Sequence, residues 1–179
     1  MSSDTESRIV ARLAGWREAR AAYGDAHPET LRAQHRLAHA YRAARRFEDA
    51  LFWFQCATQG SARRYGDRHP ETLRYRSSLA NCHYAAGNVA VAIELFAELF
   101  AARRAAMGEN HPDTLRSRGS LANALDSVGR YAEAAALHRR NVADREDALG
   151  PEHPSTEASR RNLVRTISNL GGDQEPGPG

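Results

Sequence analysis

The chain has 179 residues, which suits one domain, and its 25 basic and 22 acidic residues give a formal net charge of +3. The basic residues are interspersed with acidic ones and form no dense run of the kind found in nucleic-acid-binding tails. No apolar stretch reaches the length of about 18 residues that a membrane span needs, and the polar start does not resemble a signal peptide, so we expect a cytoplasmic protein with no membrane partner.

Every basic residue is an arginine, and alanine is also abundant. This composition favours a GC-rich, bacterial genome as the source. Whatever its origin, arginine presents a planar fork of donors that suits carboxylate and phosphate groups. Cys56 and Cys82 show no metal-ligand spacing and are predicted to be free, partly buried thiols.

A nine-residue pattern recurs every 42 residues. It begins at Gly24 as GDAHPETLR, at Gly66 as GDRHPETLR and at Gly108 as GENHPDTLR, and a partial copy, GPEHPST, begins at Gly150. A fixed period of this length indicates a stacked array in which each repeat is one helical hairpin. The sequence therefore predicts an all-α solenoid and favours a binding module.

Each repeat is expected to contain two helices. The first begins at His-Pro, because proline fits the first helical turn, and the second ends at the repeated glycine. In chain order we predict helices at about residues 7–23, 28–44, 47–65, 70–86, 89–107, 112–128, 131–149 and 154–170. The predicted solenoid spans 7–170, with a half repeat at 7–23, repeats at 24–65, 66–107 and 108–149, and a half repeat at 150–170. Residues 1–6 and the Gly/Pro-rich 171–179 are expected to be disordered.

Several short motifs recur within each repeat: HPxTL, then LA, then GRY with EA, then LG. In the third repeat they stand at 111–115, 121–122, 129–134 and 149–150. The pattern resembles the tetratricopeptide repeat over about residues 9–170, and in particular the long repeats of kinesin light chain and their relatives in high-GC bacteria. The resemblance implies a right-handed superhelix whose concave groove, lined by the first helices, binds peptides of partner proteins. The family often has Asn before LA, but here only Asn162 matches, since Arg36, Ser78 and Ser120 hold the other positions.

One polar stripe of the first helices lies opposite their apolar side and is expected to face that groove. It comprises Arg32, His35, His39 and Arg42, then Arg74, Ser77, Asn81 and Tyr84, then Arg116, Gly119, Asn123 and Asp126, and finally Arg161, Arg165 and Ser168. Asn81 and Asn123 are equivalent by the repeat, and stacked amides can hold the backbone of an extended peptide. With the arginines, they predict a site for an acidic or C-terminal peptide segment; a merely solvated polar face is the other interpretation.

No catalytic or cofactor site is predicted. The chain shows no nucleophile–base pair, paired carboxylates, phosphate-binding loop or metal cluster, so we expect neither an enzyme nor a cofactor. His35 and His39 could approach one metal, but no third ligand is evident, and a pair lining the groove is preferred. His27, His69, His111 and His153 recur with the repeat, which favours a structural role in the turn before each first helix.

Two other functions remain open. Nucleic acid could bind an arginine-lined groove with a steep salt dependence, although few aromatic residues are available for stacking. Alternatively, copies of the chain could assemble end to end. The helix at 154–170 lacks a following partner, so Leu163, Ile167 and Leu170 would be partly bare unless another copy, through Leu13 and Trp16 of its leading helix, covered them.

Overall fold

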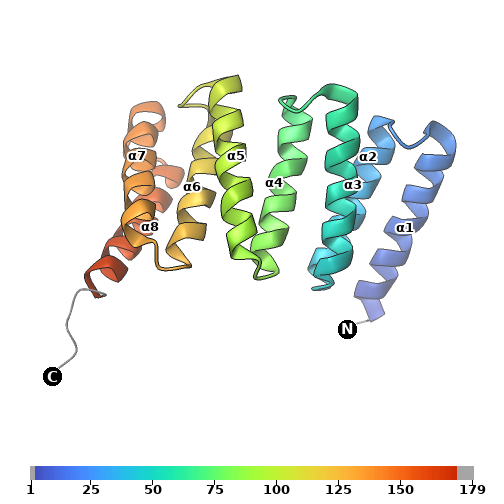
Figure 1. Ribbon diagram of the computed structural model, residues 1–179, viewed down its shortest axis with the longest axis horizontal. Helices are drawn as coiled ribbons and strands as arrows, with labels where there is room; N and C mark the ends of the chain where they lie inside the picture. Colours follow the sequence, from blue (N-terminus) through green and yellow to red (C-terminus); the bar gives the residue numbers. More distant parts are fainter. Residues whose placement is uncertain (1–2, 173–179) are drawn as a thin grey trace. The chain divides into compact units, whose positions relative to one another are not determined.

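In the computed structural model, residues 3–172 are described, and they form eight α-helices with no strand among them. Consecutive helices run in opposite directions and are joined by short turns (Figure 1). The helices are α1 (Ser3–Tyr23), α2 (Pro28–Ala43), α3 (Phe47–Tyr65), α4 (Pro70–Ala85), α5 (Val89–Met107), α6 (Pro112–Asp126), α7 (Tyr131–Leu149) and α8 (Pro154–Gly172). This architecture confirms the predicted all-α class. None of these helices is long and apolar enough to cross a membrane.

The helix boundaries differ from the predicted ones mainly at the chain ends. Residues 3–6, which were expected to be disordered, form the first turn of α1. Asp4 lies at the positive end of the helix dipole and pairs with Arg8, one turn on, at 3.7 Å. At the other end α8 continues to Gly172, two residues further than expected. The rest of the predicted disordered segments, 1–2 and 173–179, lies outside the described residues.

The junction between repeats is built the same way each time. The Nδ1 atoms of His27, His69, His111 and His153 accept hydrogen bonds of 3.1–3.2 Å from the backbone N–H two residues further on. Each ring thereby satisfies one of the otherwise unpaired donors at a helix start. The recurring histidines are helix caps, in line with the structural role expected of them.

The glycine before each cap has a backbone that other residues avoid. Gly24, Gly66, Gly108 and Gly150 have φ between +82° and +89°. At the turns within the hairpins, Gly87 and Gly129 also have positive φ, but the first hairpin turns at Arg45, with φ of +59°. The left-handed conformation explains why the 42-residue pattern begins with glycine.

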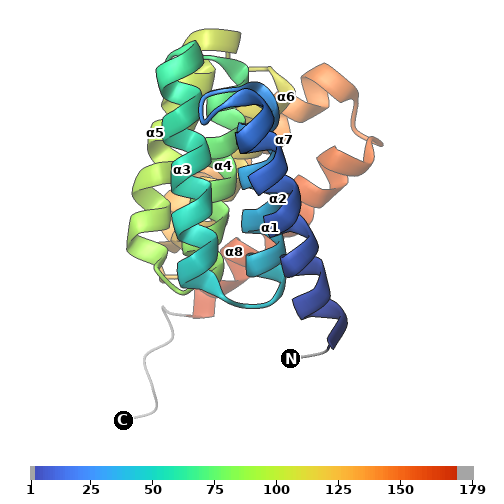
Figure 2. The same ribbon diagram turned by 90° about the vertical axis from the view of Figure 1, so that its right-hand side faces the viewer.

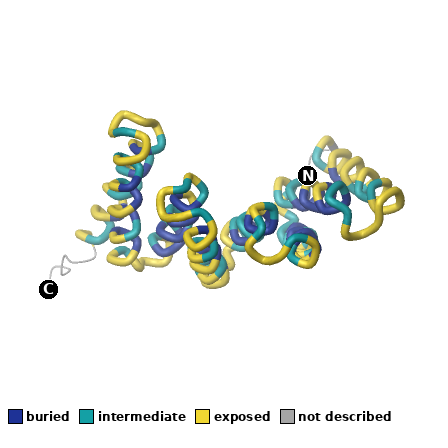
Figure 3. The backbone as a smooth tube through the Cα atoms, turned by 90° about the horizontal axis from the view of Figure 1, so that it is seen from above, coloured by how far each residue is buried: buried dark blue, intermediate teal, exposed yellow. Residues whose placement is uncertain are grey.

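The helices group into two compact units, residues 1–95 (unit 1) and 96–179 (unit 2), with the division inside α5. In both units the buried residues lie on the sides of the helices that face their neighbours, as the dark blue segments in Figure 3 show.

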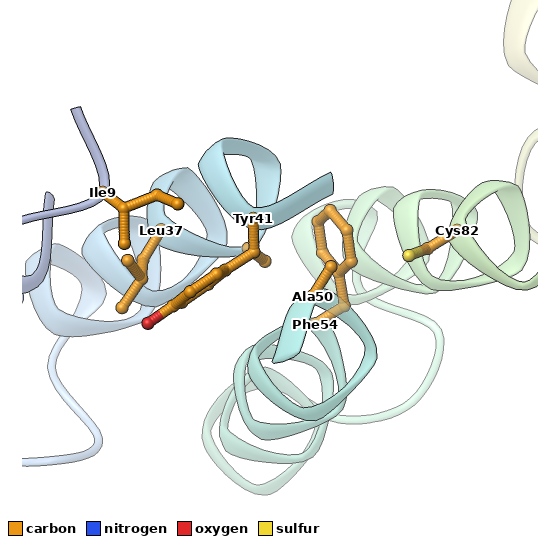
Figure 4. Close-up of a cluster of buried hydrophobic side chains, with 7 residues drawn as sticks. Ile9, Leu37, Tyr41, Ala50, Phe54 and Cys82 are labelled. Atoms are coloured by element: carbon orange, nitrogen blue, oxygen red, sulfur yellow. The ribbon is translucent and has the colours of Figure 1, made fainter. Parts of the chain in front are cut away.

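Unit 1 contains a cluster of buried apolar residues. Leu37 of α2 and Ala50 and Phe54 of α3 are fully buried, and Ala50 lets the two helices approach closely (Figure 4). The whole cluster comprises Ile9, Leu37, Ala38, Tyr41, Ala50, Phe54 and Cys82. Its formation from α1, α2, α3 and α4 ties these helices together. In Figure 2 the view is onto α1, whose outer side no other helix of unit 1 covers.

Unit 2 contains a buried ion-pair network. The Arg118 guanidinium is only 2% exposed and donates to Asp144 at 2.5 Å and to Glu109 at 2.6 Å. Arg140 approaches Asp144 at 3.0 Å, and Phe100 lies beneath Arg118 with its ring centre 5.3 Å from the guanidinium carbon. The buried charge is therefore fully paired, which is the condition under which a protein interior tolerates it.

Candidate protein-interaction surface

The polar stripe of α2 and α4 forms the first-helix face of unit 1. The residues predicted to line it are Arg32, His35, His39, Arg42, Arg74, Ser77, Asn81 and Tyr84. His35 does not line it as expected, because its side chain is buried. Its Nε2 lies 2.9 Å from the Ser78 hydroxyl, and its ring packs 4.7 Å from that of Tyr75. His35 therefore joins α2 to α4, while half-buried His39 stays at the surface, its ring 4.9 Å from that of Phe54.

Two arginines, Arg42 and Arg74, act electrostatically on the histidines of this face. Burial, followed by the charges of His39, Arg74 and Arg42, lowers the pKa of His35 to about 3. The pKa of His39 is lowered by burial and by Arg42 and Arg74. The two rings are thus held neutral within reach of two guanidinium groups. A positive potential of this kind repels a metal ion and attracts a carboxylate.

The expected row of arginines is already paired with acidic side chains. Arg32 pairs with Glu29 at 2.6 Å, Arg74 with Glu71 at 2.8 Å, and Arg116 with Asp113 at 2.9 Å. Each acidic residue lies three positions earlier on the same helix, where side chains meet. These pairs leave less charge for a ligand than the row alone suggested. Among the described residues of unit 1, Arg42 has no such partner.

The two equivalent asparagines are held in different ways. Asn81 Nδ2 donates to the Ser77 carbonyl at 2.6 Å, which leaves its Oδ1 available as an acceptor. Asn123 Oδ1 instead accepts from Arg165 at 3.3 Å, which leaves its Nδ2 as the donor. Each side-chain amide therefore keeps one of its two polar groups, the acceptor in Asn81 and the donor in Asn123, for hydrogen bonding to a peptide.

In unit 2 the corresponding stripe is largely committed to internal contacts. Arg165 lies 3.5 Å from Asp126 and also binds Asn123, so that these residues link α8 to α6. Arg161 lies 3.7 Å from Glu157. A Cβ at Gly119 would approach Asn141 Nδ2 to 3.2 Å, so this glycine serves packing against α7. The unit 2 residues are thus brought together, but mainly by binding one another.

A cavity with a mainly apolar wall, bordered by three arginines, lies beside the first-helix face and was not predicted. It has a volume of about 330 Å³, lies between α1 and α2, and is lined by Arg8, Ala11, Arg12, Arg36, His39 and Ala40. The predicted binding stripe contained only residues of the first helices, and it missed Arg8 and Arg12 because α1 is a second helix of the repeat. Their spacing of four on one helix, together with Arg36 in place of the usual Asn, was the available signal.

The comparisons with known proteins agree with this architecture. Two family profiles described as tetratricopeptide repeat match residues 30–71 and 75–147, together more than half of the chain. Among curated proteins, none matches the sequence significantly.

Solved structures give the same result. The kinesin light chain nearly identical TPR-like repeats of Podosopora anserina share 28% identity with this chain, with a TM-score of 0.83 over 95% of this chain and 81% of that one. A single-residue variant of those repeats gives a TM-score of 0.84 at 28% identity, over 95% of this chain and 80% of that one. BtubC (BKLC) from P. vanneervenii, at 16% identity and a TM-score of 0.72 over 97% and 87%, shares the fold. The matched repeats and this likeness lead to one conclusion: the chain belongs to the tetratricopeptide repeat family, with repeats similar to those of kinesin light chain.

Proposed function

We propose that the protein is a non-catalytic adaptor that binds an acidic, extended segment of a partner protein on the first-helix face of unit 1. Repeats of this family generally mediate protein–protein interactions on a scaffold that is typically non-catalytic. The observation that carries the finer proposal is the charge on this face. Arg42 has no acidic partner among the described residues, and its charge and that of Arg74 both reach His35 and His39.

Three groups of this face offer complementary contacts to a peptide. Arg42 can pair with a carboxylate, Asn81 Oδ1 can accept a backbone N–H, and the Tyr84 ring, 37% exposed, can pack against a side chain. In unit 2, Asn123 Nδ2 is the corresponding free donor. Nucleic-acid binding has less support, because Tyr84 is the one aromatic residue among those that define this face, and single-stranded nucleic acid usually stacks on several.

The test is a pull-down from source lysate followed by mass spectrometry. The variant Arg42→Ala/Tyr84→Ala removes one unpaired arginine and one exposed aromatic ring from the face. The control Phe52→Ala/Arg63→Ala removes the same two groups from exposed positions of α3. We expect a partner that wild type and the control retain and that the first variant loses, and a partner whose recovery falls as salt rises. Equal recovery by all three proteins would contradict the proposal, as would loss by the control alone.

A further inference from the structure

The cavity between α1 and α2, here called the N-terminal slot, has an internal counterpart in unit 1. A shift of one repeat, 42 residues, places Arg8 and Arg12 of α1 on Ala50 and Phe54 of α3. The same shift places Arg36 and Ala40 of α2 on Ser78 and Cys82 of α4. The slot between α3 and α4 is therefore equivalent to the N-terminal slot, and its contents show what can fill a site of this shape.

That counterpart is filled by a helix, α2. The ring centre of Phe54 lies 5.4 Å from that of His35 and 4.9 Å from that of His39. His35 also contacts the Ser78 hydroxyl, at 2.9 Å. With α2 in place, Ala50, Phe54 and Cys82 have no exposed surface at all. The geometry of the repeat therefore makes the N-terminal slot a seat for a helix that runs antiparallel to α1.

The lining of the N-terminal slot differs from its counterpart in charge. Where α3 presents Ala50 and Phe54, α1 presents two guanidinium groups, and the Arg8 side chain is 66% exposed. Arg8 has one distant partner, Asp4, at 3.7 Å. Arg12 and Arg36 are exposed and form no ion pair with any described residue. Three arginine side chains thus border a cavity whose wall is mainly apolar, and among the described residues only Asp4 forms an ion pair with one of them.

We propose that the N-terminal slot binds an acidic helix of a partner protein, in the place that α2 occupies against α3 and α4. Carboxylates spaced three or four residues apart on that helix lie on one side and meet Arg8, Arg12 and Arg36. Small apolar residues between them cover Ala11 and Ala40. The slot shares only His39 with the first-helix face, so it is a second interaction surface of the adaptor.

Charge disfavours a second copy of the chain as the occupant of this slot. The last described helix is α8, which a shift of three repeats places on α2. This shift puts Arg161 and Arg165 at the positions of His35 and His39, the residues that enter the internal slot. End-to-end assembly would therefore bring these arginines against Arg8 and Arg12. Such like-charge contacts disfavour a partner strongly.

The chemistry of the slot can be tested with a designed probe. The probe is a fluorescent, alanine-based helix of about 18 residues, about the length of the helices in such a repeat, with glutamates at alternating spacings of three and four; a matched helix has glutamine at the same positions. We expect the acidic helix to bind about tenfold more tightly than its glutamine counterpart in fluorescence anisotropy, because several exposed ion pairs together contribute on the order of 1–2 kcal/mol. This preference should disappear at high salt.

Matched variants locate the binding site. Arg8→Glu/Arg12→Glu should weaken binding of the acidic helix at least about tenfold. Arg17→Glu/Arg63→Glu makes the same change in net charge at exposed positions outside the slot and should leave affinity within about twofold. Circular dichroism would verify that both proteins stay helical, which we expect because all four arginines are exposed.

Several results would overturn the proposal. Equal affinity for the glutamate and glutamine helices would show that charge does not drive binding. Equal loss of affinity in both charge variants would show that the helix does not bind in the slot. Loss in Arg42→Ala/Tyr84→Ala with full binding in Arg8→Glu/Arg12→Glu would move the acidic helix to the first-helix face. Light scattering that shows copies associating, with the acidic helix displacing them, would assign the slot to a second copy. Because the pull-down above uses other residues, either proposal can fail alone.

Discussion

Helix α3 of unit 1 and helix α7 of unit 2 are equivalent in the repeat but differ in what they bury. Helix α3 buries Phe54 and Ala57, whereas α7 buries His138 and Asn141 at the same positions. All four residues are almost completely buried. Both ring nitrogens of His138 and Oδ1 of Asn141 lack a hydrogen-bond partner among the described residues. Two positions of the repeat thus accept apolar side chains in one hairpin and polar side chains in another.

This difference separates what the repeat fixes from what it leaves free. The helix starts, the glycine stops and the small residues Ala50 and Ala134 are shared by the two units, because they set the backbone path and the distance between helices. The side chains between them only need to fill the space and satisfy their polar groups. Unit 2 meets the second requirement for Arg118 but not for His138. We therefore expect the two units to respond differently to substitution, pH and solvent.

The largest expected effect is in the buried ion pair of unit 2. Asp144→Ala leaves the Arg118 guanidinium buried with Glu109 as its remaining acidic partner, and we expect a loss of about 3–5 kcal/mol in the free energy of unfolding. Urea denaturation followed by circular dichroism measures this loss. Asp147→Ala removes an exposed acid of the same helix and should change stability by less than about 0.5 kcal/mol. Similar midpoints for the two variants would mean that the network contributes little.

The two tryptophans allow the unfolding of unit 1 to be followed separately from that of unit 2, since Trp16 and Trp53 both belong to unit 1. Their rings lie 4.6 Å apart, so fluorescence reports the packing of α1 on α3. If the units unfold separately, Asp144→Ala should shift the circular dichroism transition and leave the fluorescence transition in place. Coincident shifts would show that the two units unfold together.

Acidification should destabilise unit 1 through His35. The pKa of its imidazole is lowered from 6.5 to about 3 in the folded chain, so the unfolded chain binds more protons between these values. Stability is therefore complete above about pH 6.5 and declines by up to about 1.4 kcal/mol per pH unit as the pH falls toward 3. Burial lowers the pKa of His83 in the same direction. Fluorescence-detected urea midpoints at pH 7 and pH 5 measure the effect, and His35→Gln should flatten it; an unchanged slope in that variant would exclude His35 as its source.

A substitution that makes unit 2 resemble unit 1 should be stabilising. His138→Phe places the residue type of Phe54 at the equivalent position and removes two buried nitrogens that lack partners. We expect a gain of about 1–2 kcal/mol in the free energy of unfolding, since a buried unsatisfied polar group costs about that much. The gain should be greater at pH 5 than at pH 7, because burial also lowers the pKa of His138. A destabilised variant would show that the space around His138 is shaped for the smaller ring.

The smallest effect is expected at the helix caps, which the two units share. His69→Ala in unit 1 and His111→Ala in unit 2 each remove one hydrogen bond to a backbone N–H at the start of a helix. Each should cost about 1 kcal/mol, while His→Asn at either position should retain most of the stability. Thermal denaturation of the four variants measures this. Unequal costs for the two histidines would show that the junctions differ despite their common sequence.

The backbone could largely be predicted from the sequence. The His-Pro starts and glycine stops placed most helix ends within one or two residues, because each signal acts through its own local geometry. The first turn of α1 was missed since Asp4 and Glu6 suggest solvent exposure, which a helix end also provides.

The side-chain arrangement was less accessible to sequence reasoning. His35 and His39 share a stripe in the sequence pattern, yet only His39 reaches the surface, because the burial of His35 depends on Ser78 and Tyr75 of the next repeat. Arg118 gives no sign in the sequence of being buried, since its partner Asp144 lies 26 residues away. Such long-range pairs decide both the interior of unit 2 and the charges left for a ligand.

The two cysteines of unit 1 differ in burial, so their chemical labelling can measure how often the unit opens. Cys82 has no exposed surface and belongs to the cluster around Phe54, whereas Cys56 is half-buried. Burial raises the pKa of both thiols, so both react slowly with alkylating reagents in the folded chain. Cys82 becomes accessible when the helices of this cluster separate, so its labelling rate measures how often they do. A helix bound in the N-terminal slot would hold α2 in place from its outer side, so slower modification of the Cys82 sulfur on α4 would report that binding event from the other side of α2.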